Sequence, residues 1–321
     1  MKLTVLICTH NRRELLARTV DSLFAAEKPA QIRPQLVIAA NACSDDTHDY
    51  LGHLASQRLA DWDFRWLPVP TPGKSQALNA ALPGLDTDWV VLIDDDHRIP
   101  DEFLQRIDAV IQSQPEADLI CGCVRPDWSG NEPDWVHERG KYRIYPVPVP
   151  HFEPFDQPRE LNQNDPIPGG GNLMLSARVV RANGGFSTDL GPVADGLAGS
   201  EDTDYVLRAL ATGFKLYYDP SIVQYHYVDP TRLKLGYVLR KAYERSCSVT
   251  RVKTDGSRPP RHLWRKLANY ALGGLFAFNV KRARFFAVRV AATLGEIQAY
   301  KLGPPSENLP AGNATEPHEI R

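Results

Sequence analysis

Three consecutive carboxylates, Asp94-Asp95-Asp96, give the strongest chemical signal in the sequence. Adjacent carboxylates repel one another, so a fold keeps them where a cation or a polar ligand compensates. In an extended segment the side chains of Asp94 and Asp96 project to one side, which suits a divalent ion that carries phosphate oxygens. A solvated acidic turn is the alternative, but the triplet directly follows the apolar run Trp89 to Ile93.

A second polar segment, Thr9-His10-Asn11-Arg12, follows the apolar run Leu3 to Cys8. A threonine, an asparagine and an arginine at the end of a strand can bind a base or a phosphate, or they can form an ordinary polar turn. The segment lacks the G-x-G-x-x-G pattern of dinucleotide-binding folds and the Walker A pattern. A dehydrogenase is therefore not favoured.

The elements that must position these residues alternate between strands and helices. We expect strands at 3–8, 36–40, 64–69 and 89–93 and helices at 15–24, 45–59 and 74–82. This alternation is typical of βαβ units, so the predicted fold class is α/β with a mostly parallel sheet flanked by helices. In such sheets ligands bind at the carboxyl ends of the strands, where both polar segments lie.

The rest of the chain changes character. Residues 125–168 are rich in proline and aromatic residues, and a helix is expected to start near Glu201. Residues 232–303 have a basic, amphipathic, helical pattern, and the proline-rich tail 304–321 is predicted to be disordered. The net charge of −2 hides an asymmetry, because residues 1–231 carry −13 and residues 232–303 carry +13.

The composition is that of a folded soluble protein, with 43% hydrophobic and 24% charged residues, which excludes wholesale disorder. No window holds the roughly 18 uninterrupted apolar residues that a membrane-spanning helix needs. The run Leu3 to Cys8 is also too short for a signal-peptide core, so we expect a cytoplasmic protein. Five cysteines, an odd number, do not make a disulfide framework, and we expect them to be free thiols that pack as small apolar groups.

Together these segments resemble the family-2 glycosyltransferases of the GT-A fold, over roughly residues 3–228. The matching motifs, in chain order, are Thr9 to Arg12, Asn41 to Thr47, Gly73 to Asn79, Asp94-x-Asp96, Gly170-Gly171-Asn172, Gly184-Gly185-Phe186 and Glu201 to Asp204. The resemblance implies a catalytic domain at 1–231, with a nucleotide-sugar-binding half at 1–124 and an acceptor-side half at 125–231. A basic helical segment, 232–303, and the tail would follow it.

The resemblance also implies an activity and a role for each residue. The expected reaction is transfer of one hexosyl group, with inversion, from a nucleoside-diphosphate sugar to an acceptor hydroxyl. Asp96, Asp94 and His226 would hold Mn²⁺ or Mg²⁺, and Asp202 would act as the general base with support from Glu201. The expected nucleotide-sugar contacts are Thr9, Asn11, Arg12, Asn41, Lys74, Asn79, Asp94 and Asp95. The expected acceptor-side residues are Gly171, Asn172, Trp128 and Trp135.

Structural and functional alternatives stay open for several of these residues. Carboxylates are favoured at a helix start, so Glu201 and Asp202 can be simple caps. Ala40 stands where the family often has an aspartate that contacts the pyrimidine base, and Asn41 is a substitute there. The Q-x-x-R-W motif of processive polymerases is absent, which favours transfer of one sugar per acceptor.

Other classes of protein are less well supported. A sugar-phosphate nucleotidyltransferase shares the layout but would have a Gly-rich loop with Arg and Lys after the first strand. A non-catalytic glycan-binding or nucleotide-sugar-binding relative has no need of the Glu201-Asp202 pair. Nucleic-acid binding is not expected, because the basic residues gather in one segment without a recognised motif.

Basic and aromatic residues interleave in residues 232–303. A helix of this kind can lie on an anionic membrane surface, or it can pack on the acidic part of the same chain. The first alternative predicts peripheral contact with the inner face of the membrane. It fits a glycan or lipid-linked sugar acceptor in the assembly of a cell-envelope polysaccharide or glycolipid.

Overall fold

The computed structural model describes residues 1–302 apart from 31, 58, 60, 146, 189–200 and 254–257. The tail predicted to be disordered, 304–321, lies outside the described residues. The chain forms two compact units. The sheet unit comprises Met1–Asp127 and Pro150–Tyr227, and the helical unit comprises Trp128–Val149 and Val228–Arg321. The predicted acceptor-side half, 125–231, is thus divided between the two units.

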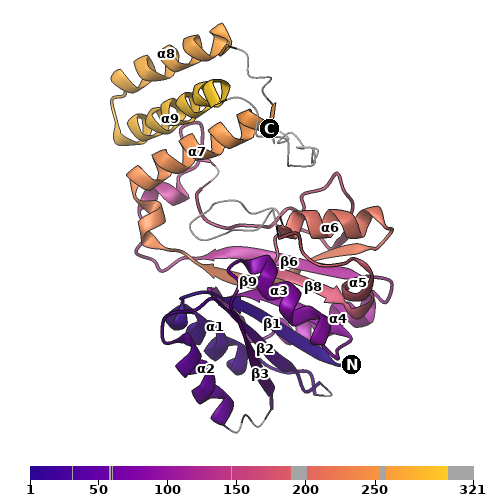
Figure 1. Cartoon of the computed structure of the whole chain (residues 1–321). Helices are drawn as coiled ribbons and strands as arrows, with labels where there is room; N and C mark the ends of the chain where they lie inside the picture. Colours follow the sequence, from indigo (N-terminus) through magenta and orange to yellow (C-terminus); the bar gives the residue numbers. More distant parts are fainter. Residues whose placement is uncertain are drawn as a thin grey trace. The chain divides into compact units, whose positions relative to one another are not determined.

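The sheet unit is built on one mixed sheet with the strand order β3-β2-β1-β4-β8-β6-β9-β5, and β7 pairs with β9 (Figure 1). The four strands predicted from the first part of the sequence form its parallel half. The strands are β1 (Leu3–Thr9), β2 (Gln35–Asn41), β3 (Asp63–Val69), β4 (Trp89–Asp94), β5 (His97–Arg98), β6 (Leu119–Asp127), β7 (Arg159–Leu161), β8 (Asn172–Ser176) and β9 (Leu216–Tyr227). The predicted α/β class is confirmed.

Helices cover both faces of this sheet, because its strands are apolar on both sides. Alternate residues of β2 fall into two separate hydrophobic clusters, with Leu36 and Ile38 in one and Val37 and Ala39 in the other. Helices α1 and α4 pack on the first cluster, and α3 and α6 pack on the second. The helices are α1 (Arg13–Ala25), α2 (Thr47–Ser56), α3 (Lys74–Ala81), α4 (Phe103–Ser113), α5 (Ala177–Ala182) and α6 (Glu201–Ala211), with a short 3-10 turn η1 (Leu82–Gly84).

The five cysteines are free thiols, as predicted. Cys121 and Cys123 lie on one face of β6 and are fully buried in the second cluster. Burial raises the pKa of Cys8 to about 12, so this thiol is protonated at neutral pH. Four of the cysteines therefore act as small packing groups in the sheet unit, and the fifth, Cys247, is buried on α7 of the helical unit.

Strand direction brings the chemically interesting residues to one edge of the sheet. The parallel strands β1, β2 and β4 end there, with Thr9, Asn41 and Asp94. Strand β8 runs the opposite way, so its first residue, Asn172, lies opposite Ile93. Strand β9 is parallel to β6, and β6 is antiparallel to β8, so the last residues of β9 reach the same edge.

The described residues of the helical unit form three helices, α7 (Leu235–Lys253), α8 (Arg261–Leu275) and α9 (Val280–Leu302), and two 3-10 turns, η2 (Asp134–His137) and η3 (Pro230–Leu233). Its small core contains Trp135, Val228 and Val238. Helices α7 and α9 approach closely because Gly295 has no side chain, and a Cβ there would overlap the carbonyl of Tyr243. The predicted helical character of 232–303 is confirmed for its described residues. None of the described helices combines the length and apolarity needed to span a bilayer.

Candidate active site

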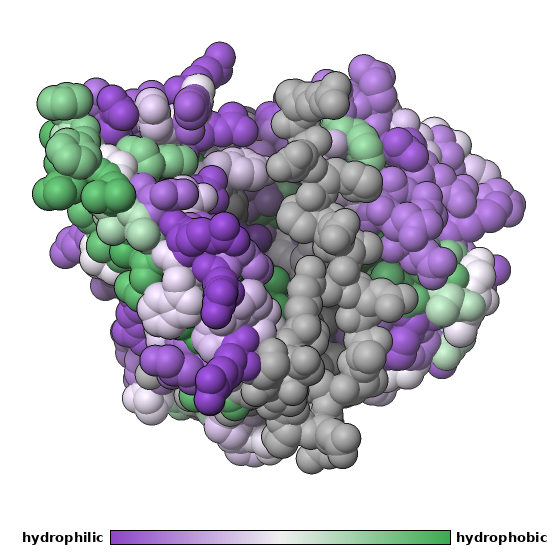
Figure 2. Space-filling model, turned by 90° about the horizontal axis from the view of Figure 1, so that it is seen from above, coloured by the Kyte–Doolittle hydropathy of each residue, from purple (hydrophilic) through white to green (hydrophobic). Residues whose placement is uncertain are grey.

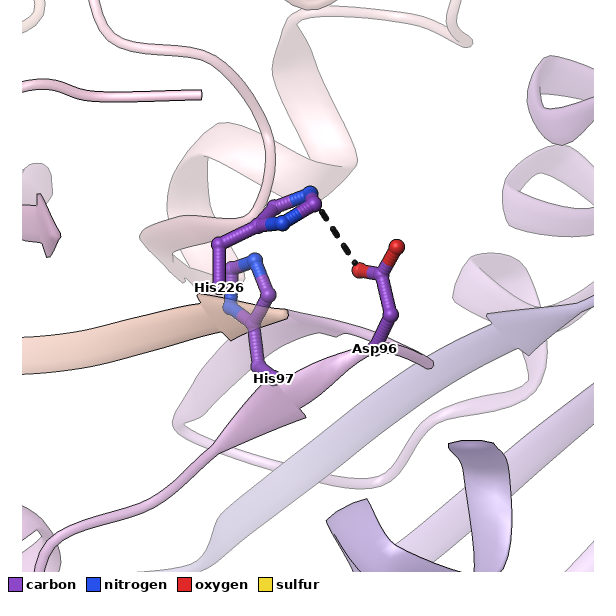
Figure 3. A group of neighbouring side chains, drawn as sticks. All are labelled: Asp96, His97 and His226. Atoms are coloured by element: carbon purple, nitrogen blue, oxygen red, sulfur yellow. Dashed lines mark ion pairs between the residues drawn. The ribbon is translucent and has the colours of Figure 1, made fainter. Parts of the chain in front are cut away.

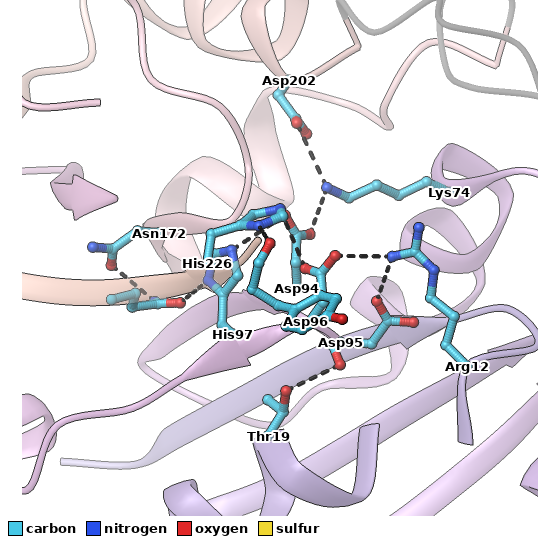
Figure 4. Close-up of polar contacts among 12 residues, drawn as sticks. Arg12, Thr19, Lys74, Asp94, Asp95, Asp96, His97, Asn172, Asp202 and His226 are labelled. Carbon is cyan, nitrogen blue, oxygen red and sulfur yellow. Dashed lines mark hydrogen bonds and ion pairs between the residues drawn. The ribbon is translucent and has the colours of Figure 1, made fainter. Parts of the chain in front are cut away.

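The Asp94-Asp95-Asp96 triplet is compensated by partners from the first βα turn (Figure 4). The Thr9 hydroxyl donates to Asp95 Oδ2 at 2.8 Å. The Arg12 guanidinium donates to Asp95 Oδ1 at 3.1 Å and to Asp96 Oδ2 at 3.0 Å. Burial, with the neighbouring carboxylate of Asp96, raises the pKa of Asp95 to about 6. Thr9 and Arg12, predicted to contact the donor, therefore hold the triplet in place in this structure.

Lys74, the first residue of α3, links two carboxylates. Its Nζ lies 2.8 Å from Asp94 Oδ1 and 3.7 Å from Asp202 Oδ2. Burial alone would lower the pKa of Lys74. The carboxylates of Asp202 and Asp94 nevertheless hold this pKa well above its ordinary value. Burial opposes the ionised form of Asp94 as well, but Lys74 outweighs it and holds the pKa of Asp94 well below its usual range. The preceding residue, Gly73, has φ 128°, a conformation that L side chains rarely adopt.

Asp202 lies in the first turn of α6, and its side chain is 15% exposed. Its Oδ1 is buried and has no hydrogen-bond partner among the described residues. The carboxylate lies against the backbone of Gly170, where a Cβ would come within 2.7 Å of Asp202 Cγ. The neighbouring Glu201 is 3% exposed. The site therefore contains a buried carboxylate oxygen that is available to accept a proton.

Asp96 and His226 face each other at the end of β9. His226 Nδ1 donates to the carbonyl of Tyr227 at 2.7 Å, and its Nε2 lies 3.4 Å from Asp96 Oδ1. In its neutral form the His226 imidazole directs the Nε2 lone pair at the carboxylate, an arrangement that a cation between them stabilises. The ligand atoms of Asp96, His97 and His226 all lie within 4.8 Å of one another (Figure 3). These residues fit a divalent ion.

The structure changes the predicted ligand set in two ways. Asp94 pairs with Lys74 and is not part of the Asp96–His97–His226 group. His97, which sequence reasoning missed, joins that group because β5 pairs with β9 in a register that places it opposite His226. The only signal in the sequence is a histidine directly after the triplet. Burial lowers the pKa of His97, which favours its neutral form.

Asn11 and Asn41 hold the loops at this edge together. Asn11 has φ 52°, and its Oδ1 accepts a hydrogen bond from the Ser44 amide at 2.7 Å. Asn41 Oδ1 accepts from the Gly73 amide at 2.8 Å, and its Nδ2 donates to the Thr71 carbonyl at 2.7 Å. Both were predicted to contact the nucleotide sugar. In the structure their amides position the turn after β1 and the start of α3, and the contacts with the nucleotide sugar stay predictions.

Asn79 and Asn172 are engaged in the same way. Asn79 exchanges two hydrogen bonds with the backbone of Phe186, accepting at 2.7 Å and donating at 2.8 Å. Asn172 is 1% exposed, and its Nδ2 donates to the Cys123 carbonyl at 2.8 Å. Both side chains thus make contacts within the fold, and the contacts of Asn79 with the donor and of Asn172 with the acceptor stay predictions. Gly171 lets the backbone approach the triplet, since a Cβ there would lie 2.6 Å from Asp94 Oδ2.

The two predicted acceptor-side tryptophans belong to the helical unit. Trp135 is 8% exposed, and the Arg284 guanidinium lies 5.5 Å from the centre of its ring. Trp128 packs against the same cluster, edge-on to His137 at 5.2 Å. The burial of Trp135 favours a packing role for this ring over the predicted role on the acceptor side.

A hollow at the opposite, amino edge of β1–β3 contains none of the predicted site residues. Charged side chains line it, and two of its pairs are ion pairs, Lys2 with Asp86 and Arg33 with Asp63 at 3.0 Å. The chemistry-bearing residues therefore gather at the carboxyl edge, where ligands of such sheets bind.

Comparison with known proteins finds relatives in sequence and in fold. The succinoglycan biosynthesis protein ExoM of Rhizobium meliloti (strain 1021) is 22% identical over 268 residues, which are 84% of this chain and 79% of ExoM. The fold is similar to that of S. aureus TarS residues 1–349, with a TM-score of 0.56, 16% identity and coverage of 94% of this chain and 90% of that one. TarS has also been solved with UDP and with UDP-GlcNAc.

A second solved structure with the same fold is the mannosyltransferase PcManGT from Pyrobaculum calidifontis, in complex with GDP-Man and Mn²⁺. It has a TM-score of 0.56 and 18% identity, and the match covers 94% of this chain and 86% of that one. The model of the family described as Glycosyl transferase family 2 matches residues 4–184, more than half of the chain. The chain therefore belongs to glycosyl transferase family 2 and has the GT-A fold.

Proposed function

We propose that this protein transfers one hexosyl group, with inversion, from a nucleoside-diphosphate sugar to an acceptor hydroxyl. The observation that carries the proposal is the position of Asp202, whose buried Oδ1 has no partner among the described residues, beside Lys74 and Asp94. A proton acceptor and a cation-binding carboxylate, Asp96, thus share one edge of the sheet. Support for the donor class comes from the solved relatives that hold UDP, UDP-GlcNAc or GDP-Man.

The proposed roles follow from these contacts. Asp202 takes the proton from the acceptor hydroxyl, because inversion requires a base on the face of the sugar opposite the leaving group. Lys74 holds the Asp202 carboxylate in position, and its positive charge lies next to Asp94. Arg12 keeps Asp96 oriented through Oδ2 and leaves Oδ1 free to face His226.

Asp96 and His226 are the proposed ligands of Mn²⁺ or Mg²⁺. When bound, a divalent ion neutralises the negative charge that develops on a nucleoside-diphosphate leaving group. Support comes from the 3.4 Å approach of His226 Nε2 to Asp96 Oδ1 and from the Mn²⁺ in the solved mannosyltransferase.

The proposed acceptor is a growing glycan or a lipid-linked sugar of a cell-envelope polysaccharide or glycolipid. ExoM, which this chain matches over most of both lengths, is named for succinoglycan biosynthesis. The helical unit adds an observation of its own. Apolar side chains more than half exposed lie where α8 and α9 join: Leu272, Leu275, Phe276, Phe278 and Val280.

This group of five residues, the α8–α9 tip, is proposed to insert into a membrane interface. Figure 2 shows hydrophobic side chains gathered together at the left of the view. Arg261, Arg265 and Arg289 are exposed on the same two helices, and arginines beside exposed Phe and Leu are typical of interfacial helices. Each contributes roughly 1 kcal/mol near an anionic leaflet. The protein would then act at the inner face of the membrane.

A hydrolysis screen tests the proposed reaction without knowledge of the acceptor. UDP-, dTDP- and GDP-sugars are incubated with the protein in Mn²⁺ or in EDTA, and released nucleoside diphosphate is measured. We expect slow release from one donor class in Mn²⁺ and none in EDTA, with Asp202→Asn as the inactive control. A protein that binds a nucleotide sugar in Mn²⁺ but never releases the diphosphate would instead be a non-catalytic relative.

A further inference from the structure

His97 is a buried histidine with one unexplained nitrogen. The residue is 3% exposed, and its Nδ1 is hydrogen-bonded to Gln224 Oε1. Its Nε2 is buried and has no hydrogen-bond partner among the described residues. Asp94 Oδ2 lies 3.9 Å from this nitrogen, which is beyond hydrogen-bond distance. A buried polar atom without a partner needs an explanation, and a bound ion is one that a nitrogen facing other ligand atoms allows.

Two side-chain amides determine which nitrogen of His97 carries the proton. Asn172 Nδ2 donates to the backbone carbonyls of Cys123 and Ile222, at 2.8 and 3.1 Å, and carbonyl oxygens only accept. Asn172 Oδ1 must therefore face Gln224, whose Nε2 donates to it at 3.0 Å. Gln224 then presents Oε1 to His97, so Nδ1 of His97 must be the donor. The neutral imidazole keeps its lone pair on Nε2.

The same tautomer occurs in the facing histidine. His226 donates from Nδ1 to the Tyr227 carbonyl, so the lone pair of its neutral form is also on Nε2. The two rings lie 5.0 Å apart, centre to centre, and their ligand atoms are within 4.8 Å of each other and of Asp96 (Figures 3 and 4). Two ligand atoms that each lie about 2.1 Å from the same ion are roughly 3–4 Å from one another. His226 Nε2 and Asp96 Oδ1 are 3.4 Å apart, which is close to this spacing.

We propose that His97 is a third protein ligand of the divalent ion, oriented by the Gln224–Asn172 amide pair, and that the site selects Mn²⁺ over Mg²⁺. Two imidazoles with one carboxylate suit a transition metal, whereas Mg²⁺ prefers an all-oxygen shell. Histidines that bind metals almost always donate their other N–H to a fixed acceptor. This inference rests on the proposed function only for the presence of a divalent ion. It adds a third ligand, two residues that position this ligand, and a preference for Mn²⁺.

The positioning role of Gln224 has a specific consequence. Replacing it with methionine keeps a side chain of similar length but removes the acceptor for His97 Nδ1–H. His97 then loses the contact that holds its lone pair on Nε2. Changes at such supporting residues typically weaken metal binding by 10–100-fold. We expect that loss for Gln224→Met even though all three ligands remain.

The test is electron paramagnetic resonance of Mn²⁺ added to the purified full chain, without any nucleotide sugar. Titration of the free Mn²⁺ signal gives affinity, and electron spin echo modulation counts coordinated imidazole nitrogens. We expect two imidazoles in the wild type and one in His97→Gln, with at least 10-fold weaker binding. Gln224→Met should also lose the second imidazole signal. His53→Gln, which changes an exposed histidine of α2, is the matched control and should resemble the wild type.

Several results would overturn the proposal. One imidazole signal in the wild type would exclude His97 as a ligand, and that measurement needs no variant to fold. Mn²⁺ affinity equal to the wild type in His97→Gln, or no Mn²⁺ binding by the wild type, would do the same. Mg²⁺ that displaces Mn²⁺ at equal concentration would refute the metal preference. No nucleotide sugar is present in this experiment, so any of these results can occur while the proposed transferase activity stands. The proposed activity can likewise fail while His97 binds the ion.

Discussion

The contact between Gly170 and Asp202 allows the proposed base to be displaced without being removed. A Cβ at Gly170 would lie 2.7 Å from Asp202 Cγ, whereas carbon atoms in contact are about 3.5–4.0 Å apart. Gly170→Ala must therefore push the carboxylate away by about 1 Å. Gly170 has no positive φ that would exclude alanine. The substitution thus moves one side chain and leaves its chemistry intact.

The expected cost follows from this displacement. A shift of about 1 Å in a catalytic group can lower the rate by about 100-fold, which corresponds to about 2.7 kcal/mol in the barrier. Donor affinity should stay within about twofold, because Asp96 and His226 are untouched. The matched control is Gly169→Ala, since Gly169 is exposed and a Cβ there meets nothing within 4 Å.

The assay is release of nucleoside diphosphate from the donor found in the screen, with kcat and KM measured for both variants. Calorimetry with the same donor and Mn²⁺ gives the affinity, and thermal melting confirms that both variants are folded. A Gly170→Ala protein with the kcat of Gly169→Ala would refute the assignment of Asp202 as the base.

Three further predictions concern the metal, the base and the membrane. Asp96→Ala should abolish Mn²⁺-dependent donor binding in calorimetry, because it removes a hard oxygen ligand; unchanged affinity would remove Asp96 from the metal site. Asp202→Asn should keep donor binding and lose roughly 10²–10⁴ in kcat, because an amide cannot take a proton; full activity there, with Glu201→Gln inactive, would move the base to Glu201. In liposome flotation the protein should bind anionic but not neutral vesicles, and less so at high salt. Phe278→Ser should weaken this binding while Val249→Ser, an exposed control on α7, should not; no binding at low salt would contradict the membrane proposal.

The edge that carries the site could be predicted from the sequence because its strands are apolar runs that end in polar residues. Thr9, Asn41 and Asp94 all end predicted parallel strands, and parallel strands in one sheet end at one edge. Seven motifs that occur in the expected order along the chain indicated the same family that the comparisons show. Local pattern was sufficient for this part of the structure.

The partners of the polar side chains could not be predicted, because they depend on contacts between distant segments. Asn79 is hydrogen-bonded to a residue 107 positions away, and Lys74 reaches a carboxylate on α6. His97 was missed for the same reason, since only the β5–β9 register brings it to His226. The burial of Trp135 depends on Arg284 and on packing within the helical unit.

Strand β9 shows how a local signal can mislead. Pro220 separates two apolar runs, 215–218 and 222–228, and this pattern predicts two separate segments, yet Leu216–Tyr227 form one strand. The pairing with β6 shifts register between Cys121 and Cys123, which pair with Tyr218 and Val223. Proline is tolerated at such a bulge because no ladder hydrogen bond from its nitrogen is needed there.

The central claim is that the carboxyl edge of the sheet binds the nucleotide sugar and its metal. A crystal structure of the wild type with Mn²⁺ and the nucleoside diphosphate of its donor tests this most directly. We predict an anomalous Mn²⁺ peak between Asp96 and His226, with the diphosphate beside it and Asp202 facing the adjoining space. A nucleotide bound in the hollow at the amino edge of β1–β3, or Mn²⁺ held away from Asp96, would contradict the account.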